Sequence, residues 1–173
     1  MKEIILISGG RKSGKSKFAE KLAIKHKVST YIALSEKRQN DMEWQYRIKL
    51  HKSRRPQHWE TIETDELNNI LENKKNGLLI DSIGGFVVKS LPMKINDWEN
   101  YKKDLIVNLI NYEKTIIIVG EQVGWGLVSE YKIGNLFADR IGELLKDLTN
   151  IANQNWITIN GKALRLDDIF IDI

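Results

Sequence analysis

The chain has 173 residues, of which 42% are hydrophobic and 29% charged, with a formal net charge of +4 at pH 7. This length suits one well-packed domain and is short for two, so a single domain over residues 1–173 is expected. No apolar run approaches the roughly 20 residues of a membrane span, the apolar stretch near the start is too short for a secretory signal, and the chain contains no cysteine, so a cytoplasmic protein without disulfides is expected.

The first half of the chain alternates between strand and helix patterns. Residues 4–7 are a continuous β-branched run that predicts a buried parallel strand ending in a tight turn at residues 8–10. A helix is expected over residues 16–26, a strand over 29–34 and a helix over 41–52 with Asp41 as N-cap. Residues 58–63 are expected to be extended, and Thr64 is expected to cap a helix that runs to Asn73.

The second half continues the alternation. Strands are expected over residues 77–81, ending in an acid, and over 115–120, while helices are expected over 97–112 and 131–153. Asn160-Gly161 is a type I′ turn signal that joins strands 156–159 and 163–166 into a hairpin. The pattern predicts an α/β fold of the P-loop NTPase type, with a mostly parallel sheet flanked by helices and an antiparallel edge hairpin.

Between the first strand and the first helix lies a complete G-x-x-x-x-G-K-[ST] motif. Glycines let backbone N–H groups approach a phosphate, and the start of the following helix adds a positive dipole end. In this motif the lysine reaches the β- and γ-phosphates and the hydroxyl coordinates Mg²⁺. The motif predicts a site for Mg²⁺ with ATP or GTP, formed by Gly9, Gly10, Arg11, Lys12, Ser13, Gly14, Lys15 and Ser16.

Two further residues are candidates for chemistry. Asp81 ends a buried strand, where an acid can hold Mg²⁺ beside a phosphate loop, although many such acids cap a helix. His51 lies in a strongly basic stretch, where a histidine is more often a surface residue. Neighbouring cations would nevertheless keep it neutral and gather phosphate around it, which suits a nucleophile that forms a phosphoramidate. The cations near the loop are explained by a small anion, and no nucleic-acid partner is expected.

Six ordered blocks from Ile4 to Leu166 resemble the adenosylcobinamide kinase / adenosylcobinamide-phosphate guanylyltransferase family of cobalamin biosynthesis. Besides the phosphate loop, they include Tyr-Ile-Ala at residues 31–33, Arg-Ile-x-x-His at 47–51 and Arg-Pro-x-x-Trp-x-Thr-x-Glu at 55–63. Val-Gly-Trp-Gly-Leu-Val at 123–128 and Phe-x-Asp-x-x-Gly at 137–142 complete the series. The resemblance covers nearly the whole chain.

The resemblance implies two activities: a nucleoside triphosphate phosphorylates adenosylcobinamide, and GTP then guanylylates a histidine that passes GMP to the new phosphate. His51 falls on that histidine. Asp81 falls on a nucleotide-binding position, as do Ala33, Leu34, Ser35, Lys52, Ser53, Arg54, Arg55 and Glu63. The family is known as a trimer, so a homo-oligomer is expected here.

The chain departs from the family's pattern at several positions. The family's Asn-Glu is Glu121-Gln122 here, and its Asp-Cys-Leu-Thr-Leu-Trp is residues 81–86, Asp-Ser-Ile-Gly-Gly-Phe. The remaining differences are Leu34 for threonine, Ser129 for proline, Asn135 for arginine and Leu145 for asparagine. Because Gly84 and Gly85 should loosen any pocket that they line, weak or absent adenosylcobinamide kinase activity is expected.

Two other functions fit the same motifs. One is a P-loop protein that binds nucleotide as a regulatory module without corrinoid chemistry. The other is a small-molecule kinase with a different acceptor. Covalent labelling by GTP separates the guanylyltransferase from both alternatives, and turnover of adenosylcobinamide separates it from the other kinase.

Overall fold

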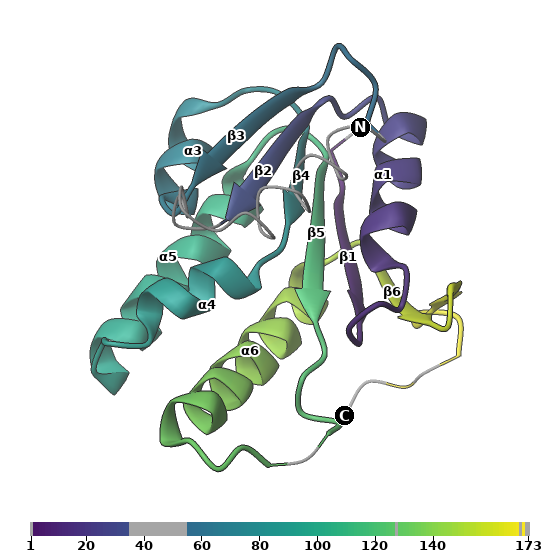
Figure 1. Cartoon of the computed structure of the whole chain (residues 1–173). Helices are drawn as coiled ribbons and strands as arrows, with labels where there is room; N and C mark the ends of the chain where they lie inside the picture. The colour runs from purple at the N-terminus through teal and green to yellow at the C-terminus, as the bar shows by residue number, and fades with distance from the viewer. Residues whose placement is uncertain (1, 35–54, 127, 170, 172–173) are drawn as a thin grey trace.

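A computed structural model of the chain describes residues 2–34, 55–126, 128–169 and 171 (Figure 1). The described residues form one sheet with the strand order β3-β2-β4-β5-β1-β6-β7. All neighbouring strands are parallel except the last pair, which is antiparallel. The strands are β1 (Ile4–Gly9), β2 (Thr30–Leu34), β3 (Glu60–Thr64), β4 (Leu78–Asp81), β5 (Ile116–Glu121), β6 (Gln154–Ile159) and β7 (Lys162–Arg165).

Helices cover both faces of this sheet. Figure 1 shows α1 on one side and α4, α5 and α6 on the other. The described helices are α1 (Lys15–Lys25), α3 (Leu67–Asn73), α4 (Gly84–Ser90), α5 (Ile95–Asn111) and α6 (Lys132–Ile151). The predicted α/β class with a mostly parallel sheet and an antiparallel edge is confirmed.

The central strands are apolar on both faces because each face has its own helical cover. Successive side chains of a strand point to opposite faces. In β1, Ile5 and Ile7 belong to the apolar cluster that includes Ala19 and Ala23 of α1. Ile4 and Leu6 belong to the larger cluster under α3, α4, α5 and α6. This double burial explains the uninterrupted apolar runs in the sequence.

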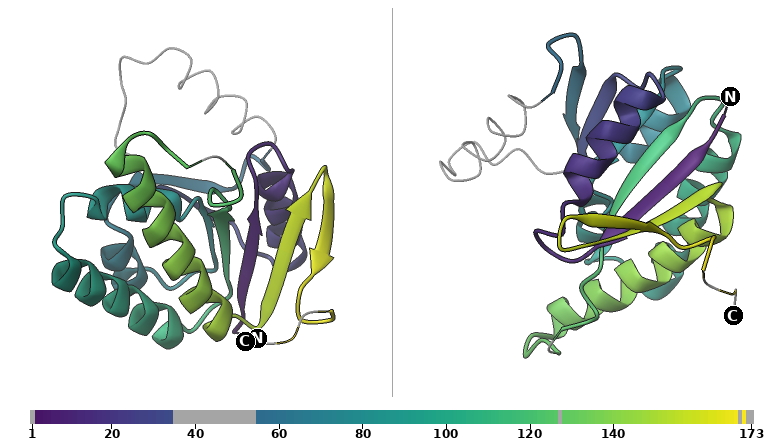
Figure 2. Two further views of the ribbon diagram at one scale, coloured as in Figure 1. Left: turned by 90° about the horizontal axis from the view of Figure 1, so that it is seen from below. Right: turned by 90° about the vertical axis from the view of Figure 1, so that its right-hand side faces the viewer.

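The edge hairpin forms as the sequence predicts. Asn160 and Gly161 have φ values of 49° and 80°, the left-handed values that a type I′ turn requires at both central positions. Figure 2 shows the hairpin in yellow, with β6 beside the purple β1. The phosphate loop at the end of β1 and the hairpin turn therefore lie at neighbouring points of the structure.

Three details differ from the sequence prediction. Thr64 does not cap α3, because Glu66 is the N-cap residue and the Thr64 hydroxyl instead accepts the Glu66 N–H at 3.0 Å. Helix α4 was not predicted, since its two leading glycines disfavour a helix, but burial of Phe86 and Val87 compensates. The predicted helix over residues 41–52 lies outside the described residues.

Among the helices that the structure describes, none combines the length and the apolar character needed to cross a membrane.

Candidate functional site

The loop between β1 and α1 has glycine at two points where its backbone requires it. Gly14 is the N-cap residue of α1 with a φ of 100°, a left-handed value that side chains disfavour. At Gly9, a Cβ would lie 2.4 Å from the Thr158 hydroxyl and 2.6 Å from the Thr158 carbonyl oxygen. Strand β6 therefore packs directly against the backbone of the loop at this position.

Strand β6 and the hairpin turn also hold the loop through hydrogen bonds. The Ser13 and Thr158 hydroxyls are 2.7 Å apart, and the Thr158 hydroxyl donates to the Ser8 carbonyl at 3.3 Å. The Gly161 N–H donates to the Ser13 carbonyl at 2.9 Å. Thr158 was missed by sequence reasoning, because its contact with the loop depends on β6 pairing with β1.

A cavity of about 760 Å³ opens in front of the loop, and it is lined by residues 11–17 and residues 121–123. Its cationic lining residues are Arg11, Lys12, Lys15 and Lys17. The Lys15 ammonium donates to the Gly10 carbonyl at 3.1 Å and so lies against its own loop. The structure thus brings motif residues 11–16 together on one cavity with four cationic lining residues, a suitable environment for a phosphate group, while Gly9 and Gly10 do not line it.

Asp81 ends β4, at the same carboxyl edge of the sheet as the phosphate loop. The buried Tyr31 hydroxyl donates to the Asp81 carboxylate at 3.0 Å. Burial, together with the negative charge of Asp81, raises the pKa of Tyr31 above its ordinary value. The phenol therefore stays protonated and fixes one oxygen of the Asp81 carboxylate. Sequence reasoning assigned no role to Tyr31.

A second acid, Glu121, ends β5 and lines the cavity. Its carboxylate accepts a hydrogen bond from the Ser82 hydroxyl and another from the Gly84 N–H at 3.1 Å. Burial raises the pKa of the Glu121 carboxyl, while the Ser82 hydrogen bond and the charge of Lys15 oppose the rise. Glu121 was noted in the sequence as a departure from the family's pattern and not as a site residue.

The two adjacent glycines do not leave the site loose, which corrects the expectation from sequence. A Cβ on Gly84 would lie 2.8 Å from Oε2 of Glu121, so that carboxylate fills the space. A Cβ on Gly85 would lie 2.0 Å from the Leu34 carbonyl oxygen, so backbone fills the space there. Each of these two glycines is therefore packed against another position where the chain departs from the family's pattern, Gly84 against Glu121 and Gly85 against Leu34.

Arg55 lies where α1, β2 and β3 meet. Its guanidinium carbon is 3.2 Å from the centre of the Tyr31 ring, and its Nε is 3.7 Å from Oε1 of Glu20. Nη1 donates to the Thr61 hydroxyl at 3.4 Å. The Arg55 side chain is 5% exposed. Its described contacts are thus made within the protein, and it does not line the cavity at the phosphate loop.

The remaining predicted residues lie beside this site or outside the described residues. Ala33 and Leu34 end β2, and Glu63 of β3 pairs with Ala33, at the same edge of the sheet. The others, which lie outside the described residues, are Ser35, His51, Lys52, Ser53 and Arg54.

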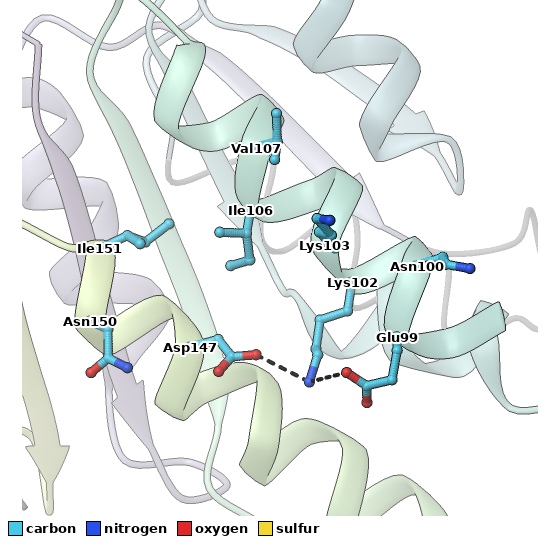
Figure 3. Close-up of a pocket in the computed structure, with 9 residues that line it drawn as sticks. All are labelled: Glu99, Asn100, Lys102, Lys103, Ile106, Val107, Asp147, Asn150 and Ile151. Atoms are coloured by element: carbon cyan, nitrogen blue, oxygen red, sulfur yellow. Dashed lines mark ion pairs between the residues drawn. The ribbon is translucent and has the colours of Figure 1, made fainter. Parts of the chain in front are cut away.

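A second hollow of about 570 Å³ lies between α5 and α6 (Figure 3). Lys102 stands at its edge, 3.2 Å from carboxylate oxygens of both Glu99 and Asp147. Glu143 lies 3.9 Å from the same ammonium, so three acids offset its charge, whereas the cations at the phosphate loop face an open cavity. Ile106 and Ile151 give the hollow an apolar wall. The cavity at the phosphate loop is therefore the candidate site.

A model of the cobinamide kinase / cobinamide phosphate guanyltransferase family matches residues 5–166. The chain belongs to this family. Its relatives within the family include the bifunctional adenosylcobalamin biosynthesis proteins CobU of Escherichia coli K12, 28% identical, and of Salmonella typhimurium LT2, 29% identical. Each match covers 94% of this chain and 99% of the relative. The family resemblance inferred from the motifs is confirmed.

A solved structure from Pyrococcus horikoshii OT3 is similar to this member of the cobinamide kinase family in fold. The match has a TM-score of 0.56 at 9% identity, and it covers 95% of this chain and 85% of the other. At that identity the likeness concerns the fold alone.

Proposed function

We propose that this protein is a bifunctional enzyme of adenosylcobalamin biosynthesis. In the first reaction the hydroxyl of adenosylcobinamide attacks the γ-phosphorus of ATP or GTP, and the nucleoside diphosphate leaves. In the second reaction GTP guanylylates His51, and the GMP passes to adenosylcobinamide phosphate. The observation that carries the proposal is a cationic cavity at a complete phosphate loop, in a chain that matches the family over residues 5–166.

The nucleotide is proposed to bind in the cavity at the loop. Backbone N–H groups of the loop surround the phosphates, and the Lys15 ammonium exchanges the Gly10 carbonyl for phosphate oxygens. Ala33, Leu34, Ser35 and Glu63 are proposed to contact the nucleotide from the neighbouring strand ends. Lys52, Ser53 and Arg54 complete the proposed binding set, whereas the buried Arg55 is proposed to support the site from within the protein through its contacts with Tyr31 and Glu20.

Ser16 and Asp81 are the residues proposed to hold Mg²⁺. Ser16 lines the cavity, and Asp81 is partly exposed at the same sheet edge. Within the described residues no three His, Asp or Glu side chains gather closely enough to hold a metal by themselves. Two protein oxygens nevertheless suit Mg²⁺, which keeps several waters and also binds substrate phosphates. When bound, Mg²⁺ would neutralise charge on the triphosphate.

The proposed guanylyl transfer uses a histidine as the temporary carrier. An imidazole nitrogen of His51 attacks the α-phosphorus of GTP and forms a nitrogen–phosphorus bond. The bond between the α-phosphorus and the bridging oxygen breaks, and pyrophosphate leaves with that oxygen. The phosphate of adenosylcobinamide phosphate then attacks the same phosphorus and frees the imidazole. The basic residues around His51 in the sequence would stabilise the charge on the pentacoordinate phosphorus. Assembly as a trimer, as in the family, belongs to the same proposal.

Mass spectrometry of the intact protein after incubation with Mg²⁺-GTP tests this function. The wild type should gain one GMP through a bond that is labile in acid and stable in base. His51→Ala should gain none, and His58→Ala, which changes an exposed histidine, is the matched control. An adduct that persists in His51→Ala would place the nucleophile elsewhere. No adduct in any of the proteins, with GTP binding confirmed, would favour a nucleotide-binding module.

A further inference from the structure

The Glu121 side chain connects two parts of the candidate site. One part is the corner between β4 and α4, residues 82–84, which directly follows Asp81. The Glu121 carboxylate accepts hydrogen bonds from the Ser82 hydroxyl and from the Gly84 N–H. The other part is the root of the phosphate loop, since Glu121 pairs with Gly9 in the β1–β5 register and the next N–H, of Gln122, donates to the Gly9 carbonyl at 3.0 Å.

The structure has room for this carboxylate because residue 84 is glycine. A Cβ at position 84 would lie 2.8 Å from Oε2 and 2.9 Å from Oε1 of Glu121. Gly84 is buried, and its own N–H donates to the Glu121 carboxylate. A larger residue at position 84 would therefore displace the Glu121 side chain from both of its partners.

We infer that Glu121 is a positioning residue, which fixes the corner carrying Asp81 relative to the phosphate loop, and that Gly84 is its matched partner. A carboxylate does not bind the oxygens of a triphosphate directly, because both carry negative charge. Glu121 instead acts through protein atoms, and Asp81 is held from two directions: by Tyr31 of β2 and by the corner that Glu121 clamps. The inference rests on the proposed nucleotide and Mg²⁺ sites.

Two single variants and the corresponding double variant test the pairing of Glu121 with Gly84. The variants are Glu121→Asn, whose side chain is one methylene shorter, Gly84→Thr, which places a side chain where the carboxylate lies, and the double variant. Glu130→Asn, which changes an exposed acid in the following loop, is the control. The affinity of each protein for a fluorescent GTP analogue is measured in Mg²⁺ and in EDTA, and thermal melting of the free protein shows that each variant is folded.

Each single variant should weaken binding in Mg²⁺ about tenfold, the size expected for lost hydrogen bonds to a charged group, and should change binding in EDTA less than about twofold. The double variant should bind better than Gly84→Thr, because the shorter Asn gives the threonine side chain space. Glu130→Asn should behave as the wild type. Should Glu121→Asn prove unfolded, Glu121→Gln, which keeps the length and loses one acceptor, takes its place with the same expectation.

Two results would overturn the inference while leaving the nucleotide site intact: wild-type affinity of the Glu121 variant in Mg²⁺, or equal losses in Mg²⁺ and in EDTA. If the loss of affinity in the double variant equals the product of the losses in the two single variants, the two residues act independently, and the pairing of Glu121 with Gly84 is refuted. A wild type that binds no GTP would overturn the proposed nucleotide site itself, and this inference with it.

Discussion

Replacing Arg55 by methionine separates two roles for this residue. The family resemblance places Arg55 at a nucleotide-binding position, whereas the structure has its guanidinium buried against Tyr31 and Glu20. If the buried contacts are its role, Arg55 stabilises the free protein, because its side chain anchors the backbone at position 55 to β2 and α1. We expect Arg55→Met to lower the stability of the free protein and to weaken nucleotide binding only in proportion to unfolding.

The contacts of Arg55 set the size of the loss. The Arg55 and Glu20 side chains are 5% and 10% exposed, so their charges are screened little by solvent. Arg55→Met loses the guanidinium contact with the Tyr31 ring and the hydrogen bond to Thr61, besides the ion pair with Glu20, while methionine retains part of the packing, so the expected cost is about 2–4 kcal/mol. For a chain of this size the melting temperature should fall by about 5–15 °C.

Differential scanning calorimetry of the free protein measures this effect. The matched control is Arg165→Met, which breaks an ion pair between Arg165 and Asp167 whose side chains are 38% and 32% exposed. Such an exposed pair should contribute less than about 1 kcal/mol. An unchanged melting temperature in Arg55→Met, accompanied by a large loss of GTP affinity, would refute the structural role and support a direct nucleotide contact.

Three further predictions concern binding, pH and turnover. Lys15→Ala should lose about 1.5–3 kcal/mol or more of GTP binding with an unchanged melting temperature; unchanged affinity would contradict the phosphate-loop assignment. Burial raises the pKa of Tyr112 to about 12, so its stability contribution should be full below pH 10.0 and should be lost as the pH rises to about 12; Tyr112→Phe should decline less than the wild type in alkaline unfolding experiments. Because Gly84 and Gly85 are closely packed, the motif departures should leave the kinase step intact, and phosphorylation of adenosylcobinamide by saturating ATP or GTP should reach a turnover on the order of 1–10 s⁻¹; weak or absent turnover would contradict the proposed first reaction.

The phosphate loop and the alternation of strands and helices were predictable because their signals are local in the sequence. The motif contains both the glycines and the lysine, and the apolar strand runs follow from burial on two faces. Helix α4 was missed for a local reason as well, since Gly84 and Gly85 have low helix propensity and the burial of Phe86 that offsets it is a tertiary effect.

The supporting residues of the site could not be predicted in the same way. Thr158 meets Ser13 across 145 positions of sequence, and Glu121 meets Ser82 across 39. These contacts depend on which strands are neighbours, and the alternation of elements does not specify the strand order. Tyr31 gave a signal in the Tyr-Ile-Ala block, but its hydrogen bond to Asp81 required knowing that β2 lies beside β4.

The contact between the hairpin turn and the phosphate loop limits where this chain can change length. Turns at the edge of a sheet ordinarily accept inserted residues, because few contacts depend on them. Here the Gly161 N–H donates to the Ser13 carbonyl, and a Cβ added to Gly14 would lie 3.4 Å from the Gly161 Cα. An insertion between Asn160 and Gly161 would therefore disturb the phosphate loop. A peptide inserted at this turn would therefore alter nucleotide binding at the phosphate loop. A peptide tag that must leave binding unchanged should be inserted elsewhere on the surface.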